Sequence, residues 1–138
     1  MRTLHLGLRV TDLDRSVAFY TTVGYEVVGA VPATDLGHLT MLKLPSDQFV
    51  TIELVHDPNG AAVDTDTRLS HLVIQVDSME TTLTVLAAGG IDAEAPTSPD
   101  GYNDVRTSWI VDPDGNRIEL VQWPAGHAAG MTATDFAE

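Results

Sequence analysis

Apolar and polar residues alternate along two stretches of the chain that share one pattern. Residues 4–10 (LHLGLRV) place leucine or valine at every second position, with His5 on the opposite face. Residues 70–76 (SHLVIQV) repeat this arrangement, with His71 in the place of His5. An alternation of period two is typical of a half-buried β-strand, so both stretches are predicted strands.

A helical pattern follows each of these strands. The first predicted helix begins after Thr11-Asp12 and the second after Asp77-Ser78, and Asp and Ser are preferred N-cap residues. Apolar residues then recur at helical spacing until Gly24 in the first half and Gly89-Gly90 in the second. Because glycine readily takes the positive φ that ends many helices, both helices are predicted to stop there.

Strands and loops complete each half, which reads as one strand, one helix and three strands. Alternation and bounding Pro, Gly and Asp residues mark these segments. The predicted strands are 25–28, 39–44, 49–55, 107–111 and 117–123, the predicted loops are 31–37, 56–67 and 95–104, and Asp112–Gly115 is a predicted type I turn. Such a repeat within one short chain predicts two modules related by a pseudo-two-fold.

The length of 138 residues fits one domain with a sizeable core. We expect a single domain over 1–138, made of a first module (about 4–56) and a second module (about 69–123). The remaining residues, 124–138, form a tail rich in Ala and Gly that is expected to pack on the surface or fray.

Composition narrows the classes of partner. The chain has 7 Lys and Arg against 20 Asp and Glu, a formal net charge of −13, which repels nucleic acid. It has no Cys, so a metal site must use His and carboxylate ligands. The sequence shows no signal-peptide pattern and no apolar run of the roughly 20 residues that a membrane span needs. We therefore expect no membrane partner and a cytoplasmic location.

Four residues share the offset of the repeat. His5 and His71 are 66 positions apart, and so are Glu53 and Glu119. All four fall on strand faces opposite the apolar positions. Two imidazoles and two carboxylates suit Zn²⁺, Ni²⁺, Co²⁺, Mn²⁺ or Fe²⁺, and the carboxylates neutralise the ion. The repeated spacing favours a metal site over the alternative, four unrelated strand residues.

Several longer motifs lie near the start of the chain and in its last predicted hairpin. They are MRTLH and LRV within 1–10, DLDRS at 12–16, Phe19-Tyr20, and DPDGNRIEL at 112–120. With these motifs the chain resembles the glyoxalase I (lactoylglutathione lyase) branch of the vicinal-oxygen-chelate superfamily, from the N-terminus to about Trp123. The resemblance implies an α+β fold of two tandem βαβββ modules that form curved, barrel-like mixed sheets.

The resemblance also implies an activity. Glyoxalase I isomerises the hemithioacetal of a 2-oxoaldehyde, such as methylglyoxal, and a thiol to a 2-hydroxyacyl thioester through a metal-stabilised enediolate. Its metal ligands match His5, Glu53, His71 and Glu119, and the metal is expected to be Ni or Zn, with Co, Mn and Fe as alternatives. By resemblance Glu119 is the catalytic base, and Glu53 can exchange roles with it. Arg9 would bind a carboxylate of the thiol cosubstrate.

The resemblance also implies an oligomeric state, and it leaves other functions of the superfamily open. Many such enzymes are homodimers whose sites form between chains, so a homodimer acting on a small-molecule substrate is expected. Another metalloenzyme of the superfamily, an epimerase or a dioxygenase, stays open, although a dioxygenase uses two His and one carboxylate on iron and Glu53 would be a fourth ligand. A metal-free small-molecule (drug) binding or resistance protein is the alternative of a different class. For Arg9 the alternative is an ordinary solvated charge.

The thiol cosubstrate also stays open between glutathione and another low-molecular-weight thiol. The predicted loop 95–104 contributes Asp100 and Asp104, and such an acidic rim is poor for the anionic tripeptide.

Overall fold

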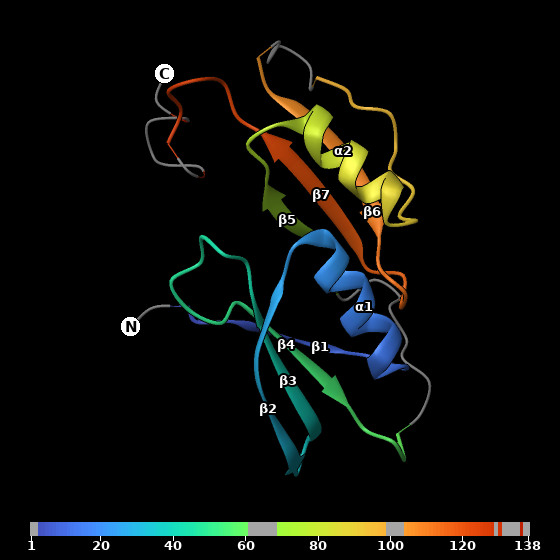
Figure 1. Cartoon of the computed structure of the whole chain (residues 1–138). Helices are drawn as coiled ribbons and strands as arrows, with labels where there is room; N and C mark the ends of the chain where they lie inside the picture. Colours follow the sequence, from blue (N-terminus) through green and yellow to red (C-terminus); the bar gives the residue numbers. More distant parts are fainter. Residues whose placement is uncertain (1–2, 61–68, 99–103, 129, 131–135, 137–138) are drawn as a thin grey trace. The chain divides into compact units, whose positions relative to one another are not determined.

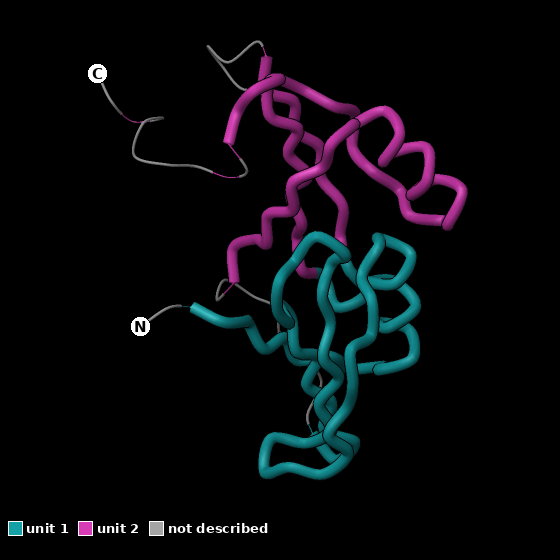
Figure 2. The backbone as a smooth tube through the Cα atoms, turned by 60° about the vertical axis from the view of Figure 1, so that its left-hand side comes forward, with its two compact units in different colours: residues 1–68, 112–115 teal, residues 69–111, 116–138 magenta. Residues whose placement is uncertain are grey.

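The computed structural model describes residues 3–60, 69–98, 104–128, 130 and 136. The chain divides into two compact units, coloured separately in Figure 2: Met1–Arg68 with Asp112–Gly115, and Leu69–Val111 with Asn116–Glu138. Each unit holds one mixed sheet and one helix (Figure 1), which is the α+β architecture that the resemblance implied.

The sheet of the first unit has four strands in the order β1-β4-β3-β2. The elements are β1 (Leu6–Arg9), α1 (Leu13–Val23), β2 (Glu26–Thr34), β3 (Gly37–Lys43) and β4 (Ile52–His56). β1 runs parallel to β4, and the other neighbours are antiparallel. The strand β4, which comes last in this unit's sequence, therefore lies inside the sheet and not at its edge.

The sheet of the second unit repeats this arrangement with the order β5-β7-β6. The elements are β5 (Leu72–Gln75), α2 (Met79–Ala88), β6 (Arg106–Val111) and β7 (Arg117–Gln122). β5 is parallel to β7, β6 is antiparallel to β7, and α2 packs on β6 and β7. The repeat implied a third strand after this helix, although the sequence pattern located only 107–111 and 117–123. Among the described residues, the predicted loop 95–104 adds only an isolated bridge between Thr97 and Thr107.

The predicted helix ends are confirmed. The Asp12 carboxylate accepts a hydrogen bond from the Arg15 N–H at 3.0 Å, and the Ser78 hydroxyl accepts one from the Thr81 N–H at 3.2 Å. These side chains satisfy backbone donors that the first helical turn leaves without a partner. Gly24, with φ of 129°, stops the first helix, as the pattern predicted.

The prediction of a loop over 31–37 was wrong. β2 continues through Pro32 to Thr34 and forms a hairpin with β3, which begins at Gly37. Proline lacks an N–H, but β2 is an edge strand, and its register shifts between Val31 and Thr34, so the missing donor breaks no ladder at that point. The loop that does exist is the short connection at 35–36.

The strand predicted over 49–55 begins later than expected, at Ile52. The cause is Asp47, whose carboxylate accepts hydrogen bonds from the Leu44 N–H and the Thr51 hydroxyl, each at 2.9 Å. These two bonds close the turn around Asp47 and hold residues 45–50 out of the sheet. An acidic side chain that bonds local backbone in this way competes with strand pairing.

The cores follow the alternation that the sequence predicted. The core includes Ile52 and Leu54 on β4 and Ile118 and Leu120 on β7. Each of these four residues has an exposed fraction of at most 1%. The glutamate between each pair must then lie on the opposite face of its strand. At the start of the first strand the pattern predicted too much burial, because Leu6 is 46% exposed.

The turn between β6 and β7 belongs to the first unit, where it meets α1. The Tyr20 hydroxyl of α1 donates a hydrogen bond of 2.7 Å to the Asp112 carboxylate, and the Thr11 N–H donates one of 3.1 Å to Asp114. Tyr20 is fully buried. Burial, followed by the charge of Asp112, raises the pKa of the Tyr20 phenol far above its usual value.

We predict that Tyr20→Phe lowers the free energy of unfolding by about 2 kcal/mol, because a buried hydrogen bond to a carboxylate is lost. Chemical denaturation followed by circular dichroism measures this change. Tyr25→Phe is the matched control, since Tyr25 is also buried but its hydroxyl makes no hydrogen bond with the described residues. Equal losses in the two variants would contradict a special role for the Asp112 contact.

The raised pKa of Tyr20 predicts that the protein loses stability at alkaline pH. The raised pKa means that the folded chain holds the phenol proton more tightly than the unfolded chain does. The resulting stability is complete below the ordinary tyrosine pKa of about 10 and decreases as the pH rises above it. The stability of Tyr20→Phe should therefore fall less steeply above about pH 10 than that of the parent protein.

Some predicted segments reach beyond the described residues. These are 61–67 of the predicted loop 56–67, 99–103 of the predicted loop 95–104 with Asp100, and residues 129, 131–135 and 137–138 of the tail. Over the described part of the chain, no helix has the length and apolar character needed to cross a bilayer.

Candidate metal centre

The first predicted ligand pair meets within the first unit. Gly7 on β1 lies directly opposite Glu53 on β4, and His5 precedes Gly7 by two residues, which puts its side chain on the same face. The His5 Nε2 lies 3.2 Å from the Glu53 Oε2. The carboxylate is mostly covered, with 13% of its side chain exposed, whereas 36% of the imidazole is exposed. Glu53 therefore has the partner that a carboxylate inside an apolar strand requires.

The second pair is built in the same way within the second unit. Val73 on β5 lies opposite Glu119 on β7, and His71 precedes Val73 by two residues. The His71 Nε2 lies 3.6 Å from the Glu119 Oε2, and 36% of the His71 side chain and 22% of the Glu119 side chain are exposed. The histidine precedes the glutamate by 48 residues in both units (53 − 5 and 119 − 71) because each unit uses the same parallel strand pair and the same register.

The second histidine has additional contacts. The Ser70 hydroxyl lies 2.9 Å from the His71 Nδ1, so a hydrogen bond occupies this nitrogen and leaves Nε2 toward Glu119. The imidazole also meets the Trp109 ring edge-on, with centroids 5.2 Å apart and an interplanar angle of 72°. Neither contact has a counterpart at the first histidine, because Leu4 and Met41 occupy the corresponding positions.

The donor atoms of each pair fit a shared cation. Zinc–nitrogen and zinc–oxygen bonds are about 2.0–2.2 Å long, so two donors on one ion lie about 3.0–3.5 Å apart. The separations of 3.2 Å in the first pair and 3.6 Å in the second match or slightly exceed this range. Imidazole and carboxylate are also ligands that zinc and nickel accept. Each pair can thus supply two neighbouring ligands to one metal ion.

The four predicted ligands are brought together as two pairs, one in each unit. Within the described residues, no group of three or more His, Asp or Glu side chains gathers in a metal-binding arrangement. The four-ligand site therefore stays a prediction. Arg9, the predicted substrate-binding residue, lies on β1 opposite Val55 with an exposed side chain. It makes no hydrogen bond or ion pair with the described residues.

Comparison with known proteins identifies the family. Residues 2–120 match the Glyoxalase/Bleomycin resistance protein/Dioxygenase superfamily. The chain belongs to this superfamily. The match covers both units and both His–Glu pairs, and it confirms the resemblance that the sequence motifs indicated.

Individual relatives of the superfamily carry glyoxalase names. The chain is 35% identical over 131 residues to a probable lactoylglutathione lyase of Vibrio cholerae, covering 92% of this chain and 94% of the relative. The trypanothione-dependent glyoxalase I of Leishmania major is similar in structure, with a TM-score of 0.71, 26% identity, and coverage of 88% and 86% of the two chains. A mutant of glyoxalase I from Zea mays gives a TM-score of 0.78 at 25% identity, covering 89% of this chain and 45% of that one.

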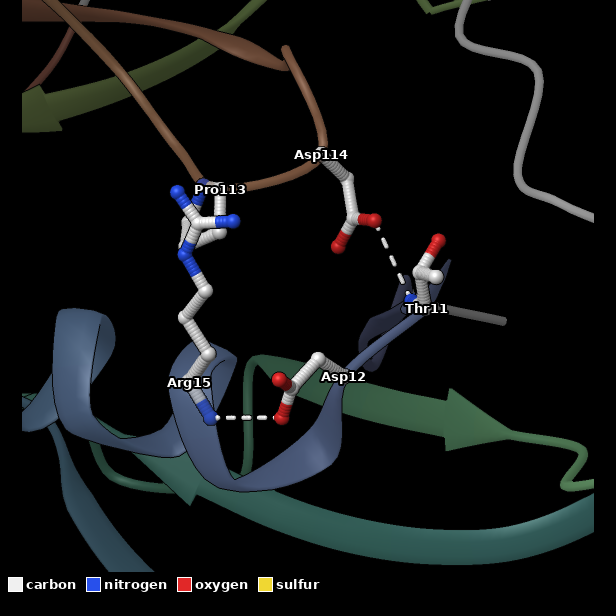
Figure 3. Close-up of a pocket in the computed structure, with 5 residues that line it drawn as sticks. All are labelled: Thr11, Asp12, Arg15, Pro113 and Asp114. Carbon is white, nitrogen blue, oxygen red and sulfur yellow. Dashed lines mark hydrogen bonds between the residues drawn. The ribbon is translucent and has the colours of Figure 1, made fainter.

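The protein also has a pocket of about 260 Å³ in the first unit. It is lined by Thr11, Asp12, Arg15, Pro113 and Asp114 (Figure 3). Both of its carboxylates already accept hydrogen bonds from backbone N–H groups, as the dashed lines in Figure 3 show. None of the predicted site residues lines this pocket, so we assign it no part in the metal centre.

Sequence reasoning missed the residues that surround His71. Ser70 directly precedes the histidine, and its hydroxyl could have been noticed as a local partner. Trp109 gave no signal, because its place opposite Glu119 depends on the register of β6 against β7. The ring contact therefore became visible only once the strands were paired.

Proposed function

We propose that the protein is a metal-dependent lyase of the glyoxalase I type. Its substrate would be the hemithioacetal of a 2-oxoaldehyde, of the methylglyoxal kind, and its product a 2-hydroxyacyl thioester. The observation that carries the proposal is the duplicated His–Glu pair, built on the same parallel strands with the same register in both units. The name of the Vibrio cholerae relative supports the reaction class.

The proposal gives the metal four protein ligands: His5, Glu53, His71 and Glu119. When bound, a divalent ion would act as a Lewis acid that stabilises negative charge on the substrate oxygens. Two carboxylates balance the charge of such an ion, which suits a site that is partly covered. Nickel or zinc is the first choice, and cobalt, manganese and iron also accept this ligand set.

In the proposed reaction Glu119 moves the proton. Its carboxylate takes the proton from the carbon that bears the sulfur and the hydroxyl, and returns it to the adjacent carbon. The step is an isomerisation, so it needs no oxidant or reductant. The exposed fraction of the side chain favours Glu119 over Glu53, 22% against 13%, because a substrate reaches it more easily. Glu53 is the second carboxylate with which it can exchange roles.

The proposal extends to a homodimer in which two chains complete each site. Each unit supplies one His–Glu pair, so two chains together supply the pairs for two metal ions. Sedimentation of the purified protein, with and without metal, measures this assembly. A monomer with full activity and one metal ion per chain would contradict a site shared between chains.

Arg9 is proposed to bind a carboxylate of the thiol cosubstrate, by a charge-assisted hydrogen bond. Its exposed guanidinium has no partner among the described residues and is therefore available. The thiol is glutathione or another low-molecular-weight thiol. The net charge of −13 makes a single well-placed arginine more important for an anionic cosubstrate.

We predict that Arg9→Ala raises KM about tenfold and leaves kcat within about twofold, because the lost contact binds substrate and transition state equally. Steady-state kinetics at several thiol concentrations separate the two constants. Arg15→Ala removes the same charge from the exposed face of α1 and should leave both constants unchanged. An equal fall in kcat and in kcat/KM for Arg9→Ala would argue for a transition-state role.

The test of the proposed function combines metal analysis with an isomerase assay. The protein is stripped of metal, reloaded with each candidate ion, and assayed with methylglyoxal and several thiols, glutathione included. Activity that depends on the added metal supports the proposal. A metal content below about 0.1 per chain that stays unchanged after incubation with Ni²⁺ or Zn²⁺ would favour a metal-free binding protein instead.

A further inference from the structure

The second histidine contacts Ser70 and Trp109, and neither contact has a counterpart at the first histidine or a part in the proposed function. Trp109 lies on β6 directly opposite Glu119, on the same face of the sheet as the His71 ring that it contacts. In the first unit the residue opposite Glu53 is Met41, and His5 has no ring contact with the described residues. The two halves of the ligand set are therefore supported unequally.

Trp109 is itself held in place by a second neighbour, Arg117. The Arg117 guanidinium lies 4.2 Å from the centroid of the indole, a cation–π contact between diagonal neighbours on β6 and β7. The Arg117 guanidinium also lies 3.8 Å from the Glu94 carboxylate. Arg117 thus covers the indole, and its ion pair with Glu94 favours this position of the guanidinium.

Glu94 closes this arrangement through its backbone. Its N–H donates a hydrogen bond of 2.9 Å to the Trp109 carbonyl, and its carbonyl accepts one of 2.7 Å from the Ser108 hydroxyl. The segment that carries Glu94 is therefore fixed to the same strand that carries the indole. Backbone bond, ion pair and cation–π contact together form a closed chain of contacts around Trp109.

We infer that Trp109 is a positioning residue for His71, held in place by Arg117 and Glu94. The indole restricts the imidazole to the orientation in which Nδ1 meets Ser70 and Nε2 faces Glu119. A ligand that is already oriented loses less conformational freedom when it binds a metal. The second pair is then the better organised half of the ligand set. The inference rests on the proposed function for its metal, but not for the orientation of the ring.

The first experiment uses the metal-free protein and tests the orientation alone. NMR measures the His71 side-chain rotamer from coupling constants and its contact with Trp109 from cross-relaxation between ring protons. We expect one rotamer in the parent protein and in Trp109→Phe, and rotamer averaging in Trp109→Ala. A single unchanged His71 rotamer in Trp109→Ala would overturn the inference, whether or not the protein binds metal.

The second experiment measures the dissociation constant for Ni²⁺ by competition with a chelator. Replacing residues that orient metal ligands typically weakens affinity 10–100-fold, so we expect about tenfold weaker binding in Trp109→Ala and a change within about threefold in Trp109→Phe. Met41→Ala, at the corresponding position in the first unit, is the matched control and should bind as the parent does. Equal affinity in the parent and in Trp109→Ala would overturn the positioning role.

A substitution at the surface keeps the inference testable if Trp109→Ala does not fold. Arg117 is half exposed, so Arg117→Gln removes the contact over the indole without opening a cavity. We expect a second His71 rotamer to appear and Ni²⁺ binding to weaken about threefold, a partial version of the effect of Trp109→Ala. A parent protein that binds no Ni²⁺ would defeat the proposed function, while the rotamer measurement would still decide the role of Trp109.

Discussion

Glu119→Gln is expected to lower kcat by about a thousandfold while the fold is kept. General base catalysis contributes about 10²–10⁴-fold, and the amide cannot accept the proton that the carboxylate takes. The side chain keeps its shape, and its amide oxygen can still face the His71 Nε2, 3.6 Å away in the parent protein. Kinetics of the metal-loaded variant measure the loss, and circular dichroism verifies the fold.

Metal content separates the two roles proposed for this residue. If Glu119 is mainly the base, the variant binds metal nearly as the parent does and fails to turn over. If it is mainly a ligand, metal content and activity fall together. Glu26→Gln, which removes an exposed carboxylate from the edge strand β2, is the control for lost charge. An unaltered turnover rate in Glu119→Gln would contradict both roles.

His71→Ala is expected to weaken Ni²⁺ binding by at least about a hundredfold. The variant loses one of four proposed ligands, and even residues that only orient a ligand commonly contribute 10–100-fold. Glu119 would also lose its neighbour within the second unit. Titration of the metal-free variant with Ni²⁺, followed by calorimetry, measures both the affinity and the number of ions bound.

The stoichiometry in this titration tests whether the two pairs serve one ion. If they share a metal, His71→Ala and His5→Ala lose the same tight site. If each pair binds an ion by itself, each variant should keep half of the metal with unchanged affinity, and the four-ligand centre would be wrong. His38→Ala removes a half-buried histidine of β3 and should leave the titration unchanged.

The sequence could predict the pairs because their cause is local and repeated. In each parallel strand pair, the residue opposite the glutamate is preceded by the histidine at a distance of two residues. Because side chains alternate between faces along a strand, the histidine and the glutamate lie on the same face. The equal offset of 66 residues for His and Glu reports that the same register is used twice. The helix caps at Asp12 and Ser78 were predictable for a similar reason, since a cap needs only its own first turn.

Other features could not be predicted because they depend on strand neighbours. Pro32 was expected to lie in a loop, but it lies in β2, an edge strand where a missing N–H is tolerated. The bond between Tyr20 and Asp112 joins residues 92 positions apart, so no local pattern contains it. The division of 1–138 into two modules of a single domain stays a prediction.

By itself the sequence determined the family motifs, the alternation that buries Ile52 and Leu54, and the identity of the four candidate ligands. These depend on residue type and on periods of two or of about 3.6 residues, which short-range sterics and hydrogen bonding set. The tertiary structure alone decided that His71 is held by Trp109 and that Arg117 covers the indole. Such contacts arise from the register between strands, and register is a property of the whole sheet.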